Sequence, residues 1–209
     1  MASGDKTYPD ADNWISANEP TTNWNGRSEI RVGDQGGANP PEATGIIRFT
    51  MPSDPGGGNV IDSIVFWAKT ESLQGSDADE ITIYQGTNTA ATTFSESTST
   101  YGLYSTGNSW AADGARSDFT REISTRATLT VDETYYDWPI LGGSTTNDAD
   151  ITWGEVLALQ LIMDDVGGVS DNQHDLHNRE TAGTTQDPYI VVTYSVPAAS
   201  DNALAMCNF

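Results

Sequence analysis

The feature that most constrains this chain is a period-two alternation of apolar and polar residues, in short runs broken by Gly, Pro, Asn, Asp and Ser. Such runs are typical of half-buried β-strands joined by turns. The run Val60–Lys69 places Ile64 and Phe66 on one face and Trp67 on the other, so both faces are expected to be partly covered. The run Val156–Met163 has one entirely apolar face and predicts a central core strand.

The pattern predicts about ten strands. Besides the two runs above, the candidates are Trp14–Ser16, Glu29–Val32, Gly45–Phe49, Ile81–Tyr84, Ala127–Val131, Tyr135–Trp138 and Tyr189–Tyr194. We expect the run at 81–84 to pair with the run at 60–69, and the runs at 127–131 and 135–138 to form a hairpin. Residues 85–126 are rich in Thr, Ser, Gly and Asn and predict a long loop, either a functional excursion or a clamp over a sheet end.

Length and composition favour one all-β domain. The chain has 209 residues, a hydrophobic fraction of 36%, 20 glycines and 9 prolines, which suits a turn-rich β protein. Two smaller domains are the alternative. We place the domain at residues 1–196, and the remaining residues, 197–209, show no strand alternation. That tail is expected to be either a frayed terminus or an arm that docks on a neighbour.

The charge balance excludes several classes of partner. There are 30 Asp and Glu against 9 Lys and Arg, a formal net charge of −21. Nucleic acid binding needs clustered basic residues, and an anionic membrane surface would repel this chain. The longest apolar run is too short to cross a bilayer. The single cysteine, Cys207, excludes an intrachain disulfide, and the polar N-terminus predicts no signal peptide, hence synthesis in a cytoplasm.

Several segments occur in an order that carries more information than each segment alone. The chain opens with DNWISANEPTTNWNGRSEIRVGDQG, GIIRFTMP and VIDSIVFWAK, continues with NSWAADGARSDF and TVDETYYDWPI, and closes with ALQLIM, HNRETA and PYIVVTY. This order, over roughly residues 8–195, resembles the DNRLRE-type domains. The resemblance implies a jelly-roll β-sandwich of two antiparallel sheets, related to carbohydrate-binding modules and without catalytic machinery.

The resemblance also implies two possible settings. Such domains usually occur in large bacterial surface and secreted proteins, and sometimes in phage structural proteins. A stand-alone module made in a host cytoplasm favours a virion surface protein, such as a capsid decoration or tail-associated subunit, with other virion proteins or further copies of itself as partners. The alternative is a carbohydrate-binding or adhesion module of a bacterial surface protein, located outside the cell and binding a glycan.

The stretch DNQHDLHNRE holds both histidines of the chain, His174 and His177. An H-x-x-H spacing among acids suggests a metal site, but residues i and i+3 of a strand point to opposite sides, so the two imidazoles could not easily share one ion. The other interpretation is a structural one, with His177 and Arg179 on one strand face. We then expect Arg179 and Glu180 to pair with groups on neighbouring strands.

Oxygen-rich loops suggest calcium. Candidate ligands are Asp10, Asp12 and Asp34, because carboxylate and carbonyl oxygens are what Ca²⁺ prefers, although no loop has EF-hand spacing. The same acids single out no carboxylate pair for glycoside hydrolysis, and no Gly-x-Ser-x-Gly elbow occurs. A structural calcium ion is therefore the one cofactor expected, and no enzyme activity is predicted.

Six tryptophans could serve packing or sugar binding, since an indole face stacks on apolar surfaces. Trp67 and Trp138 lie in predicted strands and are expected in the core. Trp24 and Trp110 lie in predicted loops and are the candidates for a ligand platform.

Overall fold

Alternating apolar residues form nearly all of the regular structure as β-strands. The computed structural model describes residues 2–33, 43–56, 58–74, 80–126, 129–143, 147–164, 173–179 and 185–197. The strands are β1 Ala2–Thr7, β2 Ala11–Ser16, β3 Glu29–Gly33, β4 Ala43–Thr50, β5 Val60–Gln74, β6 Glu80–Gly86, β7 Leu103–Ser105, β8 Asn108–Ser109, β9 Arg121–Arg126, β10 Tyr135–Leu141, β11 Val156–Asp164, β12 Gln173–His177 and β13 Tyr189–Ser195. The short helix α1, Thr89–Thr92, and a 3₁₀ turn at Asp113–Ala115 are the helical elements of the described ranges. The all-β prediction is confirmed.

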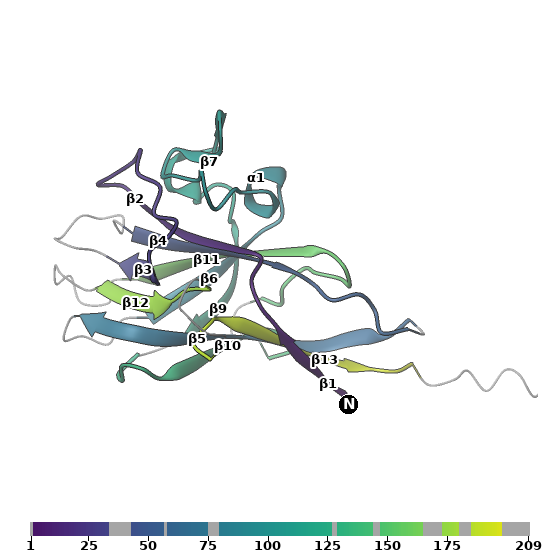
Figure 1. The fold of residues 1–209 in the computed structure, drawn as a ribbon. Helices are drawn as coiled ribbons and strands as arrows, with labels where there is room; N and C mark the ends of the chain where they lie inside the picture. Colours follow the sequence, from purple (N-terminus) through teal and green to yellow (C-terminus); the bar gives the residue numbers. More distant parts are fainter. Residues whose placement is uncertain are drawn as a thin grey trace, which may run out of the picture.

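Eleven strands form one large, curled antiparallel sheet, which Figure 1 shows from the side. The order of neighbours is β1-β13-β5-β12-β3-β4-β11-β6-β9, with β10 also paired to β5 and β2 also paired to β4. A second, small sheet contains only β7 and β8.

Strand β5 joins the two parts of the curled sheet. It is 15 residues long and pairs with β13 over Val60–Trp67, with β10 over Ile64–Lys69 and with β12 over Thr70–Gln74. A strand of this length can pair with neighbours in two parts of a sheet, because different stretches of its backbone supply the N–H and C=O groups for each part. The path of β5 therefore fixes how the β1-β13-β5-β10 portion lies relative to the remaining strands.

The main core lies on the inner side of the curl. Phe66 of β5 contacts Phe49 of β4, with ring centroids 6.1 Å apart, so strands distant in the sheet order face each other. The buried Trp138 of β10 donates a hydrogen bond from Nε1 to the carbonyl of Ile81 of β6 at 3.1 Å. The same core includes the apolar row predicted for β11: Leu157, Leu159, Leu161 and Met163.

A second core covers the outer side of β2, β4 and β11. The excursion between β6 and β9, which rises above these strands in Figure 1, contributes Phe94, Trp110 and Phe119. They pack on Ile46 of β4 and Ala158 of β11. Because both sides of these strands are covered, alternation is weak here and nearly every residue of β2 and β4 is buried. The segment predicted as a loop is thus a compact cap with short elements of its own, and its last six residues are strand β9.

Two predicted pairings are wrong. Strand β6 pairs with β11 and β9, not with β5, because its inward residues belong to the opposite side of the core. Residues 129–131 form no strand and make no hairpin with β10. Instead, the hydroxyl of Tyr136 accepts hydrogen bonds from the backbone N–H groups of Thr130 and Val131, which satisfies them without a ladder. Strand β1 was not predicted, and the tail from residue 198 lies outside the described residues.

We predict that Trp138→Ala lowers the free energy of unfolding by about 3–5 kcal/mol, since it leaves a large cavity in the core. Chemical denaturation monitored by circular dichroism measures the change. Val131→Ala is the control: this side chain is 54% exposed, and its loss should change stability by less than about 0.5 kcal/mol. If Trp138→Ala changed the free energy of unfolding only slightly, this would contradict the conclusion that the Trp138 ring is a main packing element of the core.

Candidate functional site

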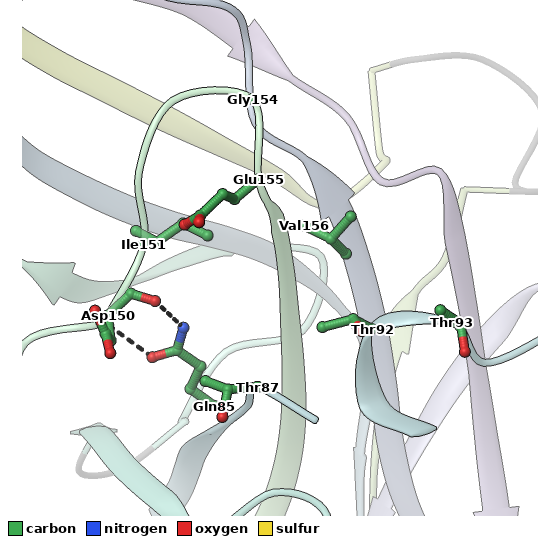
Figure 2. A pocket seen from close by; sticks show the side chains of 9 residues that line it. All are labelled: Gln85, Thr87, Thr92, Thr93, Asp150, Ile151, Gly154, Glu155 and Val156. Atoms are coloured by element: carbon green, nitrogen blue, oxygen red, sulfur yellow. Dashed lines mark hydrogen bonds between the residues drawn. The ribbon is translucent and has the colours of Figure 1, made fainter. Parts of the chain in front are cut away.

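A polar groove of 480 Å³ lies between α1 and the loop that leads into β11 (Figure 2). It is lined by Gln85, Thr87, Thr92, Thr93, Asp150, Ile151, Gly154, Glu155 and Val156. The side chain of Gln85 donates to the carbonyl of Asp150 at 2.7 Å and accepts from its N–H at 2.8 Å. Glu155 accepts from the N–H of Thr152 at 2.8 Å. These groups hold the loop in place, so their polar character has a structural reason.

The predicted calcium ligands engage different partners. Asp10 pairs with Arg48, with Nε 2.6 Å from Oδ1, and also accepts from the hydroxyl of Thr50. Asp12 is buried and accepts from the N–H of Arg179 at 2.9 Å. Asp34 lies outside the described residues. Within the described ranges, no group of three or more His, Cys, Asp or Glu side chains is arranged to hold a metal ion.

Arg179 fastens the cap to the sheet. Its Nε donates to Oε1 of Glu96 at 2.9 Å, and its Nη2 donates to Oε2 of the same carboxylate. The N–H of Asp12 also reaches Glu96, at 3.4 Å. Next to this Glu96 clamp (Asp12, Glu96 and Arg179), the side chain of Asn13 donates to the carbonyl and hydroxyl of Ser99. The clamp therefore joins β2, the cap and the segment after β12. Glu180 lies outside the described residues.

The two histidines lie on β12 and are separated as strand geometry requires. His174 Nδ1 lies 3.0 Å from the carbonyl of Gln173, whereas His177 Nε2 lies 3.3 Å from Oε1 of Glu133. The strand ends at His177, so Arg179 does not continue its face as predicted. The N–H of Asn178 still donates to the carbonyl of Ser28 at 3.3 Å, in register with the β12–β3 pairing, but the chain turns at Arg179, whose own N–H donates to Asp12.

The two loop tryptophans differ in their surroundings. Trp110 is only 5% exposed, packs in the second core and donates from Nε1 to the carbonyl of Thr100 at 2.9 Å. The expectation of an accessible ring at position 110 is wrong, because the cap folds around it. Trp24 is half-buried and stacks on Trp14, with centroids 4.2 Å apart and an interplanar angle of 12°.

The outer side of the β1-β13-β5-β10 portion carries an aromatic cluster that was not predicted from the sequence. Tyr189 lies at its centre, with ring centroids 6.1 Å from Trp67, 5.5 Å from Tyr135 and 6.3 Å from Tyr8. The ammonium of Lys6 lies 3.8 Å above the Tyr189 ring, a cation–π contact. We call these five residues the aromatic face. Its rings come from β5, β10, β13 and the residue after β1.

The expectation that Trp67 is a core residue is wrong. Phe66 and Ala68 point into the main core, so Trp67 must point outward, and it is half-buried among the other rings. The signal was present in the alternation, since Val65 and Trp67 form the second apolar row of the run. The expectation followed from the place of Trp67 in a predicted strand, but a strand residue can face either side of the sheet.

Titratable groups next to the aromatic face are perturbed by burial. Burial, with Tyr189 and Asp187 nearby, raises the pKa of Tyr135 to about 12, and its hydroxyl donates to the carbonyl of Thr185 at 2.9 Å. Burial also raises the pKa of Asp187, whose Oδ1 has no hydrogen-bond partner. By contrast, the hydrogen bond from Lys69 lowers the pKa of Glu133.

Comparison with known sequences assigns this chain to no family. A scan against protein-family models returned no match, and a search of curated proteins found no similar sequence. The likeness to DNRLRE-type domains therefore depends on the order of the sequence motifs and stays a prediction. No helix among the described residues has the length and hydrophobicity needed to cross a bilayer.

We predict a coupling energy of about 1 kcal/mol between Glu96 and Arg179, because the pair is bidentate and partly buried. A double-mutant cycle with Glu96→Gln and Arg179→Gln, measured by chemical denaturation, gives the value. A second cycle with Glu96→Gln and Arg121→Gln is the control and should give a coupling near zero. If the effects of Glu96→Gln and Arg179→Gln on stability are additive, the two side chains do not interact, which would contradict the role of the Glu96 clamp.

We predict that Asp187→Asn stabilises the protein at pH 7. The raised pKa means that the folded state binds the Asp187 proton more tightly than the unfolded state does, so stability falls as pH rises through the folded pKa. Asparagine removes the buried charge. The gain in stability of the variant over the wild type should disappear below about pH 3.9, where the carboxyl of the unfolded chain is itself protonated. Thermal unfolding at pH 7 and pH 3 measures the difference. A lower midpoint for the variant at pH 7 would contradict the argument.

Proposed function

We propose that this protein is a non-enzymatic structural protein of a virion surface, a capsid decoration or tail-associated subunit, and that its aromatic face docks on another protein of the particle. The observation that carries the proposal is the gathering of Tyr8, Trp67, Tyr135 and Tyr189 on the outer side of one sheet portion. Tyrosine and tryptophan are the residues enriched at the centres of protein interfaces.

The surroundings of the aromatic face support a protein partner. Tyr8 is 38% exposed, and Val65, Pro139 and Val191 extend the half-buried apolar surface along the same strands. Contiguous apolar surface on a sheet face marks interaction sites. Lys6 within the face and the half-buried Asp137 beside it supply charged groups, which suits an interface that mixes apolar and polar contacts.

The proposed fold is a jelly-roll β-sandwich. In this arrangement β1, β13, β5 and β10 form one layer, and β2, β4, β11, β6 and β9 form the other. The ring contact between Phe49 and Phe66 and the hydrogen bond from Trp138 to Ile81 support two layers around one core. The resemblance to DNRLRE-type domains favours the same fold and the absence of catalytic machinery.

A second candidate function is carbohydrate binding or adhesion at the surface of a bacterium. The observation that favours it is the near-parallel arrangement of Trp67 and Tyr189, with an interplanar angle of 13°, because flat aromatic surfaces on an open sheet also suit pyranose rings. A bound calcium ion, as predicted from Asp10, Asp12 and Asp34, would belong to this candidate or to the first as a structural ion.

The experiment that tests the proposal is particle purification. Virions from a lysate that contains this chain are banded on a density gradient and analysed by mass spectrometry. The proposal predicts the chain in the band that holds the capsid protein. Its presence in the lysate together with its absence from the particles would contradict the virion assignment, and binding of the pure protein to a glycan array would favour the second candidate.

We predict that Trp67→Ala and Tyr135→Ala each weaken rebinding of the pure subunit to stripped particles by at least tenfold, roughly the effect of losing an interface hot spot. Co-sedimentation over a concentration series measures the affinity. The matched control is Glu155→Gln in the polar groove, which should rebind like the wild type. Unchanged rebinding of both aromatic variants would place the docking surface elsewhere.

A further inference from the structure

Asn25 and Gly26 are the only Asn–Gly pair of the chain and lie in a tight turn between β2 and β3. The N–H of Arg27 donates to the carbonyl of Trp24 at 3.2 Å and closes this turn. Gly26 has a φ of +88°, and a Cβ at this position would meet no atom within 4 Å. Both residues of the pair are exposed, so water has direct access to their backbone and side-chain atoms.

The groups that could react with each other in this pair are not held by hydrogen bonds. In the part of the chain that the structure describes, neither the side-chain amide of Asn25 nor the N–H of Gly26 has a hydrogen-bond partner. The side-chain amides of other asparagines are engaged as donors, as in Asn88, Asn108 and Asn147. The side chain of Asn25 is therefore free to turn toward the backbone that follows it.

We propose that Asn25 is a site of covalent self-modification, in which its amide is lost as ammonia and an aspartate or isoaspartate residue is formed. The backbone nitrogen of Gly26 attacks Cγ of Asn25, which is sterically possible because glycine has no Cβ beside that nitrogen. A new C–N bond closes a five-membered succinimide ring, and the bond from Cγ to the side-chain nitrogen breaks. The proton of the attacking nitrogen passes through water to the departing nitrogen, which leaves as ammonia.

Water completes the modification by opening the succinimide ring. Addition of water at one ring carbonyl gives aspartate, whereas addition at the other gives isoaspartate, in which the main chain runs through the former side-chain carbon. The only co-reactant is water, and nothing is oxidised or reduced. Each product adds a negative charge, and isoaspartate also lengthens the main chain by one carbon atom.

The modified turn would disturb contacts on both of its sides. Before the turn, Asn23 donates to two backbone carbonyls of the cap, at 2.8 and 2.7 Å, and accepts from the N–H of Asn25 at 3.1 Å. After the turn, the carbonyl of Arg27 accepts from the side chain of Asn178 at 2.6 Å. A longer main chain between these two anchors cannot keep both in their present geometry. Isoaspartate at position 25 therefore loosens the attachment of the cap to the sheet.

The experiment is an ageing series of the intact protein at pH 7 and pH 9. Samples are digested and analysed by mass spectrometry, with synthetic peptides that contain asparagine, aspartate or isoaspartate at position 25 as chromatographic standards. We expect both products at Asn25, and conversion at least about tenfold faster than at the exposed Asn108, a difference of about 1.4 kcal/mol in activation free energy. Conversion should be faster at pH 9, because the attacking nitrogen must lose its proton.

Variants separate the chemistry from its structural effect. Asn25→Gln keeps the amide but would have to close a larger ring, so this variant should stay unmodified during the series. Aged wild-type protein should unfold about 2–4 °C below fresh protein, roughly the effect of losing one hydrogen bond in a domain of this length. Fresh Asn25→Asp, which adds the charge without lengthening the main chain, should unfold like the fresh wild type.

Three results would overturn the proposal: an unchanged Asn25 after ageing, equal conversion at Asn25 and Asn108, or aspartate as the only product. An equal fall of the unfolding midpoint in aged Asn25→Gln would overturn the structural effect assigned to the turn. Particle attachment through the aromatic face does not enter these measurements.

Discussion

The alternation of side chains along β5 is the constraint on which the rest of the structure depends. Ile64, Phe66 and Ala68 point into the main core, and this fixes Trp67 and Lys69 on the outer side. A one-residue slip in register would exchange the two sides. Because β5 pairs with β10, β12 and β13, its register also positions the residues of those strands. The same alternation therefore determines both the core and the aromatic face.

The sequence predicted the strands well where one side faces the core and the other faces outward. The runs that became β3, β5 and β13 were found in place, because their alternation survives in the structure. The run that became β11 was found from its entirely apolar row, although both of its sides are covered. It predicted the cap poorly. Residues 85–126 bury Phe94, Trp110 and Phe119 on the outer side of β4 and β11, and aromatic residues without period give no sign of where they pack. Pairing was the weakest inference, since β6 and β5 lie on opposite sides of the core.

The residues of the candidate sites were also predictable from the sequence only in part. Trp24 was singled out as a loop residue and does line a small cavity, but Trp14, on which it stacks, was not selected, because no local pattern connects the two rings. Arg179 was expected to form a structural pair, and the structure places it on Glu96, a residue 83 positions away that no local pattern connects to it.

The aromatic face joins Tyr8, Trp67, Tyr135 and Tyr189, which only the sheet topology brings together.

We propose that the aromatic face is the docking surface of a particle subunit. Oxidative footprinting of the subunit, free and bound to particles, tests it most directly, because side-chain oxidation depends on solvent access. We expect that modification of Tyr8, Trp67 and Tyr135 falls on binding, while modification of Val131, which is 54% exposed and is not one of the residues of this face, does not change. Equal modification of the three aromatic residues in the free and the bound subunit would contradict the claim.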